Sequence, residues 1–325
     1  MMRRLARYHR PGQQPNIAIW SSARSGSSWL MELIASQPGF VFVDEPLHPG
    51  NMLAADWIPG TDADAWQFLL PNPEREQVFR ERFSAIESGS PTPGMPRIRS
   101  GFYRWRTNRI VYKLLRAKDL MPWFEDTFDW QTVYLLRHPL ATAISRKVFP
   151  RLPLFLENEA YRTTYLDDRQ LHLARAIVQD GSPVEQAVLD WVLQNLPALQ
   201  QAETRNWLIV HYEDLVRHPA GVIARLAGGL DLPEPERMLR RVNAPSGSVV
   251  QSDATTRQAF RQATGPDTDF LLSRWREKLS AGDEQAAFRI LDAFEIRRYQ
   301  PGHDLPVSGS TETDRALPRR PEATG

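Results

Sequence analysis

Residues Trp20–Leu30 read W-S-S-A-R-S-G-S-S-W-L, and this stretch decides the predicted fold. The apolar run Asn16–Trp20 precedes the small residues and is typical of a buried strand. Apolar residues at helical spacing follow them: Trp29, Leu30, Leu33 and Ile34. The order of strand, small-residue loop and helix predicts an anion site, because the first helical turn leaves N–H groups unpaired and the helix dipole adds positive charge.

The loop residues suit an anionic ligand. Gly26 permits a backbone conformation that other residues resist, and it lets an oxyanion approach the main chain. Arg24 adds a positive charge, and the hydroxyl donors are Ser25, Ser27 and Ser28. The loop does not fit the nucleotide phosphate motif G-x-x-x-x-G-K-[ST], since Ser27 stands in place of the lysine, and no G-x-G-x-x-G dinucleotide motif occurs.

A second strand-to-helix junction reads V-Y-L-L-R-H-P-L-A-T-A-I-S-R, from Val133 to Arg146. The strand predicted at Thr132–Leu136 ends at Arg137, and Ser145 lies in the helix predicted at Leu140–Val148. An arginine at the carboxyl end of a strand can bind a phosphate through two N–H groups, and the serine of the next helix can reach the same phosphate. Arg146 is a candidate third contact.

The two junctions together resemble the donor-binding motifs of sulfotransferases that use 3′-phosphoadenosine 5′-phosphosulfate. Arg24–Ser28 resembles the R-S-G-[ST]-[ST] form of the 5′-phosphosulfate loop in carbohydrate-type and bacterial members. Arg137 with Ser145 resembles the 3′-phosphate motif of the same family. Weaker resemblances lie at Ile209–Pro219 and Trp275–Tyr299, whereas the middle of the chain, about 50–108 and 150–205, matches nothing in the family.

The resemblance also implies contacts with the adenosine part of the donor. Trp29 stands where family members stack an aromatic ring on adenine. The alternative is that Trp29 packs in the hydrophobic core. Tyr212, in the Y-E-D-L segment, is a candidate adenine contact or a structural residue. Arg257, in the loop at 246–265, is a candidate contact with the far side of the 3′-phosphate.

Sulfuryl transfer needs a base that takes the proton of the acceptor. Glu45 follows the strand predicted at Phe40–Val43, and D-E-P-L resembles the E-P motif whose glutamate is taken as the base in carbohydrate sulfotransferases. A partly buried carboxyl group beside Asp44 is expected to accept a proton more readily. His48 is the competing base, because a histidine titrates near neutral pH.

Two cations are candidates for stabilising the charge that develops in the transition state. Arg24 is expected to contact the leaving oxygen and the sulfuryl oxygens, together with the amides of Ser25–Ser28. Lys113 lies in the strand predicted at Arg109–Leu115, which reads as buried, and a buried lysine needs an anionic partner. We expect Lys113 either to face the donor or acceptor sulfate or to reach solvent at the strand end.

The remaining pattern predicts an α/β fold with a central parallel sheet flanked by helices on both faces. A further strand is expected at Trp207–His211. Helices are expected at 74–86, 167–179, 184–203, 212–227, 270–279 and 284–297. The resemblance implies a P-loop-like sulfotransferase domain at 16–299, between a basic, flexible segment 1–15 and a disordered tail 300–325. The segment S-P-T-P-G-M-P at 90–96 predicts a surface loop or lid.

Composition excludes several classes of protein. The 325 residues include 40 basic and 39 acidic side chains, and a net charge of +1 argues against a general nucleic-acid binder. The lack of cysteine excludes disulfides and thiolate sites, and it is compatible with a reducing cytoplasm. No apolar run is long enough for a membrane span, and no metal-ligand spacing of histidines occurs, so we expect no metal.

The sequence therefore predicts a sulfotransferase that uses 3′-phosphoadenosine 5′-phosphosulfate and acts by in-line displacement with a carboxylate base. We expect a soluble bacterial enzyme with a small-molecule or glycan acceptor, such as a sugar or natural-product hydroxyl. Two alternatives stay open: a nucleotide-dependent phosphotransferase, and a nucleotide-binding module without catalysis. The acceptor and the oligomeric state are not readable from the sequence.

Overall fold

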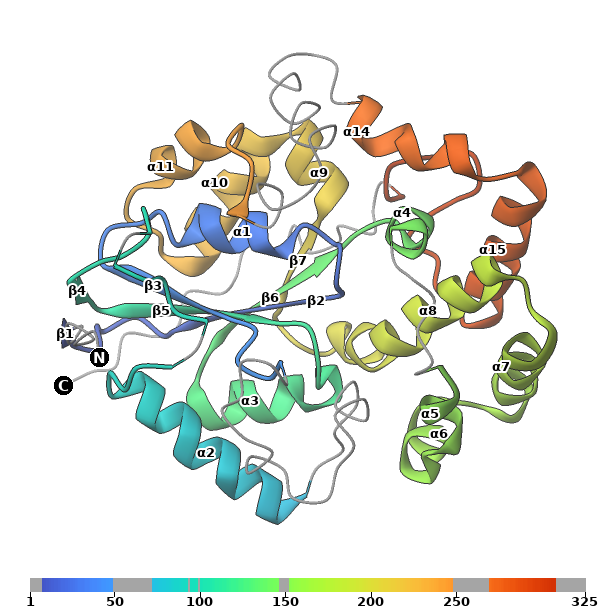
Figure 1. The fold of residues 1–325 in the computed structure, drawn as a ribbon, viewed down its shortest axis with the longest axis horizontal. Helices are drawn as coiled ribbons and strands as arrows, with labels where there is room; N and C mark the ends of the chain where they lie inside the picture. The colour runs from blue at the N-terminus through green and yellow to red at the C-terminus, as the bar shows by residue number, and fades with distance from the viewer. Residues whose placement is uncertain are drawn as a thin grey trace.

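A computed structural model of the chain describes residues 8–48, 72–92, 94–98, 100–145, 152–247 and 269–307. Its centre is a five-stranded sheet in the order β3-β5-β2-β6-β7, in which all neighbouring strands are parallel. The strands are β2 (Ile17–Ser21), β3 (Phe40–Asp44), β5 (Arg109–Leu114), β6 (Gln131–Leu136) and β7 (Leu208–His211). Helices cover both faces of the sheet (Figure 1), so the predicted fold class is confirmed.

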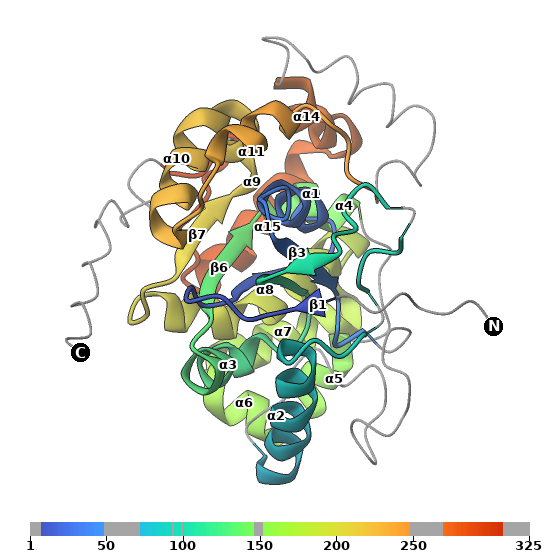
Figure 2. The ribbon, with the colours of Figure 1, turned by 90° about the vertical axis from the view of Figure 1, so that its left-hand side faces the viewer.

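One face of the sheet packs on α1 (Ser27–Ile34), α10 (Pro219–Leu230) and α11 (Pro235–Arg241). Ile17 and Ile19 of β2 point into this core, because alternate residues of a strand face the same side. Figure 2 shows these layers from the side, with α10 and α11 on one side of the sheet and α2 and α3 on the other.

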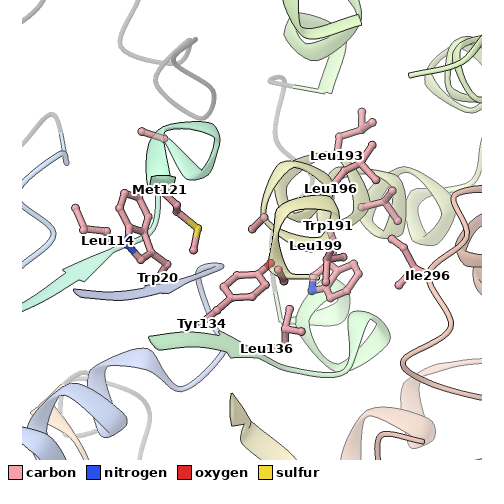
Figure 3. Close-up of a cluster of buried hydrophobic side chains, with 14 of the residues drawn as sticks. Trp20, Leu114, Met121, Tyr134, Leu136, Trp191, Leu193, Leu196, Leu199 and Ile296 are labelled. Atoms are coloured by element: carbon pink, nitrogen blue, oxygen red, sulfur yellow. The ribbon is translucent and has the colours of Figure 1, made fainter. Parts of the chain in front are cut away.

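The opposite face packs on α2 (Pro73–Glu87), α3 (Met121–Phe128) and α8 (Pro183–Ala202). Trp20 of β2 and Tyr134 of β6 point toward this core, to which Trp191 of α8 also belongs (Figure 3). Helix α8 continues through Pro197, which has no N–H for the carbonyl of Leu193. The hydroxyl of Tyr161 donates to that carbonyl instead, so the proline leaves no buried acceptor unpaired.

The remaining elements close the molecule around the sheet. They are α4 (Pro139–Ile144), α5 (Leu152–Glu157), α6 (Glu159–Tyr165), α7 (Asp168–Asp180), α9 (Tyr212–Arg217), α14 (Asp269–Ser273), α15 (Ala281–Ala293) and the 3₁₀ turns Lys118–Leu120 and Arg274–Lys278. The single helix predicted at 212–227 is wrong. It is divided at His218, because Pro219 disfavours helical geometry at the residue before it and begins α10.

The predicted ends of the chain need correction where the structure describes them. Tyr8–His9 lies in the segment 1–15 that was predicted to be flexible, yet it forms the strand β1. This strand pairs with β4 (Arg106–Thr107). At the other end, Asp304 forms an ion pair with Arg276 at 2.7 Å. The first part of the predicted tail 300–325 is therefore attached to the rest of the fold. Residues 1–7 and 308–325 lie outside the described residues. Among the described residues, no helix has the length and apolar character to cross a membrane.

Candidate active site

Several of the predicted site residues follow strands that end at one edge of the sheet. All five strands are parallel, so their carboxyl ends lie at the same edge, where ligands bind in open α/β sheets. The serine-rich loop follows β2, Glu45 follows β3, Arg137 follows β6 and Tyr212 follows β7. The elements of the two sequence motifs are therefore brought together by topology.

The loop after β2 needs glycine at position 26. Gly26 is the residue before α1 and has a left-handed backbone with φ of 89°. A Cβ atom there would lie 2.5 Å from the ring of Tyr212, closer than any tolerated contact. Arg24 is also left-handed, with φ of 70°, at a cost of about 1–2 kcal/mol for a residue with a side chain. Its side chain is exposed at the loop.

The three hydroxyls of the loop are used differently. Ser25 is buried, and its hydroxyl, predicted as a donor for an anion, donates to the carbonyl of Ser22 at 2.6 Å and so shapes the loop. Ser28 Oγ accepts from the ammonium group of Lys113 at 3.0 Å. Ser27 is the first residue of α1 and is buried. The N–H groups of the first turn of α1 remain donors for an anion, since they have no partner within the helix.

Lys113 connects this loop with the residues after β3. Its ammonium group lies 2.6 Å from Asp44 Oδ1 and 3.0 Å from Glu45 Oε1. The register explains the contact, because Asp44 of β3 pairs directly with Lys113 of β5. Burial alone would lower the pKa of Lys113, but Asp44 and Glu45 outweigh it and raise that pKa. The alternative in which Lys113 reaches solvent is wrong, since the residue is 3% exposed.

Glu45 lies in a tight turn that also holds His48. Its backbone is left-handed with φ of 47°, and its N–H donates to the carbonyl of Lys113 at 2.9 Å. The N–H of His48 donates to the carbonyl of Glu45 at 2.9 Å, so both candidate bases belong to one turn. The predicted loop 90–96 reaches the same place, because the N–H of Asp44 donates to the carbonyl of Gly94 at 3.2 Å.

Arg137 joins the second motif to the first. Its Nη1 donates to the carbonyl of Arg24 at 2.9 Å, across 113 residues of sequence. Its guanidinium carbon lies 4.3 Å from the centre of the Tyr212 ring. Ser145 is exposed at the end of α4, where its hydroxyl donates to the carbonyl of Thr142 at 2.8 Å. The predicted contacts Arg146 and Arg257 lie outside the described residues.

The two aromatic candidates form part of the core beneath the loop. Trp29 is 7% exposed, and its indole N–H donates to the carbonyl of Val242 at 3.1 Å. Its ring meets the ring of Tyr212 edge-on, with centres 5.9 Å apart. Tyr212 is buried, and burial raises its pKa. These contacts give Trp29 its structural role, and a contact of either ring with adenine stays a prediction.

Glu213, beside Arg137, was not predicted from the sequence. Its carboxylate accepts from the N–H of His138 at 2.8 Å and from the hydroxyl of Tyr299 at 3.2 Å. Burial raises the pKa of Glu213 to about 7. The Y-E-D-L segment pointed to this place, yet only the structure shows that its glutamate faces inward.

Within the described part of the chain, no cluster of three or more histidine, aspartate or glutamate side chains could hold a metal ion.

Comparison with known proteins gives a family for most of the chain. The model of the sulfotransferase domain family matches residues 14–264. The sulfotransferase domain of the Synechococcus PCC 7002 olefin synthase is 19% identical, with 90% of this chain and 99% of that chain covered and a TM-score of 0.47. Mouse sulfotransferase SULT7A1 complexed with PAP is 14% identical, with 87% and 84% covered and a TM-score of 0.43. No curated protein matches the sequence.

Proposed function

Because the chain belongs to the sulfotransferase domain family, we propose that one domain, at about 16–299, transfers a sulfuryl group from 3′-phosphoadenosine 5′-phosphosulfate to a hydroxyl group. The proposed acceptor is a sugar or natural product of small size. The donor supplies an activated sulfuryl group on a phosphate leaving group, and no metal is needed for this transfer.

The observation that carries the proposal is the hydrogen bond from Arg137 Nη1 to the carbonyl of Arg24, 2.9 Å long. It holds the residue proposed for the 3′-phosphate against the loop proposed for the 5′-phosphosulfate. A donor with anionic groups at both positions needs these two motifs side by side.

The donor atoms at this place fit two anionic groups. Arg137 Nε is buried and has no hydrogen-bond partner among the described residues, so the guanidinium group keeps a donor for a phosphate. At the loop after β2, the exposed Arg24 side chain and the amino end of α1 offer positive charge for the second anionic group. A buried donor without a partner is costly unless a ligand pairs with it.

Glu45 is the proposed base. Its carboxylate takes the proton of the acceptor hydroxyl as the acceptor oxygen bonds to sulfur, while the bond from sulfur to the bridging phosphate oxygen breaks and its electron pair stays on the phosphate. Lys113 holds Glu45 and Ser28 at 3.0 Å each, so the base is tied to the loop. Arg24 and the first-turn amides of α1 stabilise the charge on the leaving phosphate and the sulfuryl oxygens.

Titration calorimetry with 3′-phosphoadenosine 5′-phosphate and with ATP tests the donor class. We expect micromolar affinity for the former, little for ATP, and a loss of about 100-fold in Arg137→Ala. The matched control is Arg205→Ala, whose ion pairs with Glu125 and Asp126 lie at the opposite edge of the sheet. Preference for ATP, or an unchanged affinity in Arg137→Ala, would remove the proposed 3′-phosphate site.

A further inference from the structure

Asn195 is a buried polar residue of α8, a helix whose other buried residues are mostly apolar. It is 1% exposed, and its neighbours in the core include Trp191, Val192 and Leu196. Burying an amide costs free energy unless each of its polar atoms is paired. A buried and paired amide orients the groups that it bonds, because a paired polar network specifies one arrangement of its members.

The amide of Asn195 is paired with both strands that lead into the proposed donor site. Its Oδ1 accepts from the hydroxyl of Ser22, after β2, at 2.9 Å. The same oxygen accepts from the hydroxyl of Tyr134, in β6, at 2.8 Å. Its Nδ2 donates to the carbonyl of Trp191 at 2.6 Å, which fixes the orientation of the amide on α8. Figure 3 shows Tyr134 pointing from β6 toward α8.

Ser22 in turn shapes the loop. Its carbonyl accepts from the hydroxyl of Ser25 at 2.6 Å and from the N–H of Ser25 at 3.3 Å. This closed turn precedes the left-handed Gly26 and the first turn of α1. The contacts therefore run from Asn195 through Ser22 to Ser25, which directly precedes Gly26 and the first turn of α1.

We propose that Asn195 is a positioning residue of the donor site, which holds the serine-rich loop in its anion-binding shape through Ser22. The inference rests on the proposed function, since the ligand of the loop is the donor. Asn195 itself touches no reacting atom and lies below the loop. The same oxygen also ties Tyr134, three residues before Arg137, to α8.

Calorimetry with 3′-phosphoadenosine 5′-phosphate on Asn195→Leu tests this role. We expect the Kd to rise about tenfold, because the Ser22 hydroxyl loses its acceptor. The control is Gln37→Leu, which removes a fully buried amide bonded to the backbone of Glu234, away from the loop. We expect its Kd to match that of the wild type even if its melting temperature falls. If Asn195→Leu does not fold, Asn195→Ser replaces it, since its side chain is too short to reach Ser22.

A second variant separates positioning from general loss of stability. If Asn195 acts through Ser22, its substitution in a Ser22→Ala background changes the Kd by less than about twofold. An unchanged Kd in Asn195→Leu, or a tenfold loss that persists in the Ser22→Ala background, overturns the inference while the donor site stands. A wild-type protein that does not bind the nucleotide overturns the proposed function itself, and the inference with it.

Discussion

The ammonium group of Lys113 lies 3.0 Å from the carboxylate of Glu45, at the edge of the sheet where the parallel strands end. Lys113 is almost completely buried there. Asp44 approaches the same ammonium group to 2.6 Å, and the two carboxylates raise the pKa of Lys113 in spite of its burial. A positive charge is thus fixed between the serine-rich loop and the proposed base, and it holds the Glu45 carboxylate at the loop.

We expect Lys113→Met to lower kcat/KM by at least 100-fold, because it removes a charge next to the reacting groups. It should also lower the free energy of unfolding by about 1–3 kcal/mol, since Asp44 and Glu45 lose their partner but are partly open to solvent. Steady-state kinetics and urea unfolding measure the two effects. Lys278→Met, at an exposed lysine, is the control. Wild-type kinetics in Lys113→Met would exclude Lys113 from the reaction.

Glu45→Gln decides between the two candidate bases. It keeps the shape of the side chain and removes the proton acceptor, so we expect kcat to fall by about 100-fold to 10,000-fold. The Kd for 3′-phosphoadenosine 5′-phosphate should change by less than about threefold. His48→Gln is the matched variant in the same turn, and we expect it to keep most of the activity. The reverse ranking of the two variants would make His48 the base, and a wild type that binds without turnover would favour a silent binding module.

The fold and the two strand-to-helix junctions that carry the candidate motifs were predictable from the sequence. The strands are rich in apolar and β-branched residues. Small residues follow β2 and a proline follows β6, where a helix begins in each case, so these two strands and the helices after them can be recognised in the sequence. Arg24, Gly26 and Arg137 were chosen by residue type and by resemblance to the family's donor-binding motifs. The structure brings Arg137 against the loop, and the contacts of these residues with a donor stay a prediction.

The contacts between elements were not predictable. The Lys113–Asp44 ion pair depends on the register of β3 against β5, which no local pattern encodes. Asn195 lies within a long helix and carries no motif, so its contact with Ser22 follows from packing alone. The division of the helix predicted at 212–227 could have been predicted from the sequence, because Pro219 marks the boundary.

Gly26→Ala should damage the loop itself. The added Cβ meets two ring carbons of Tyr212 at 2.5 and 2.7 Å, and the left-handed backbone at this position resists a side chain. We expect a loss of about 2 kcal/mol or more in the free energy of unfolding and a rise of at least tenfold in the Kd for the nucleotide. Gly221→Ala in α10 is the control, since nothing lies within 4 Å of its added Cβ. Equal affinity in Gly26→Ala and Gly221→Ala would contradict the assigned geometry.

Glu213 makes the stability of the protein depend on pH. Its pKa is raised to about 7 by burial, against the hydrogen bonds from His138 and its own N–H, the charge of Arg137 and the hydroxyl of Tyr299. The folded state therefore holds a proton between about pH 4.5 and 7 that the unfolded state releases. The stabilisation is complete below pH 4.5 and is lost as the pH rises through 7. His138 acts in the opposite direction, because burial and the charges of Arg276 and Arg137 lower its pKa to about 3.

Comparing the wild type with Glu213→Gln cancels the contribution of His138. The difference between their free energies of unfolding should fall by about 3 kcal/mol from pH 4.5 to pH 8, because only the wild type loses a proton from this site. Urea unfolding at four pH values across this range measures it, with Glu81→Gln on the exposed side of α2 as the control. A difference that stays constant with pH would mean that Glu213 is already ionised across this range in the folded protein, and that its pKa is not raised.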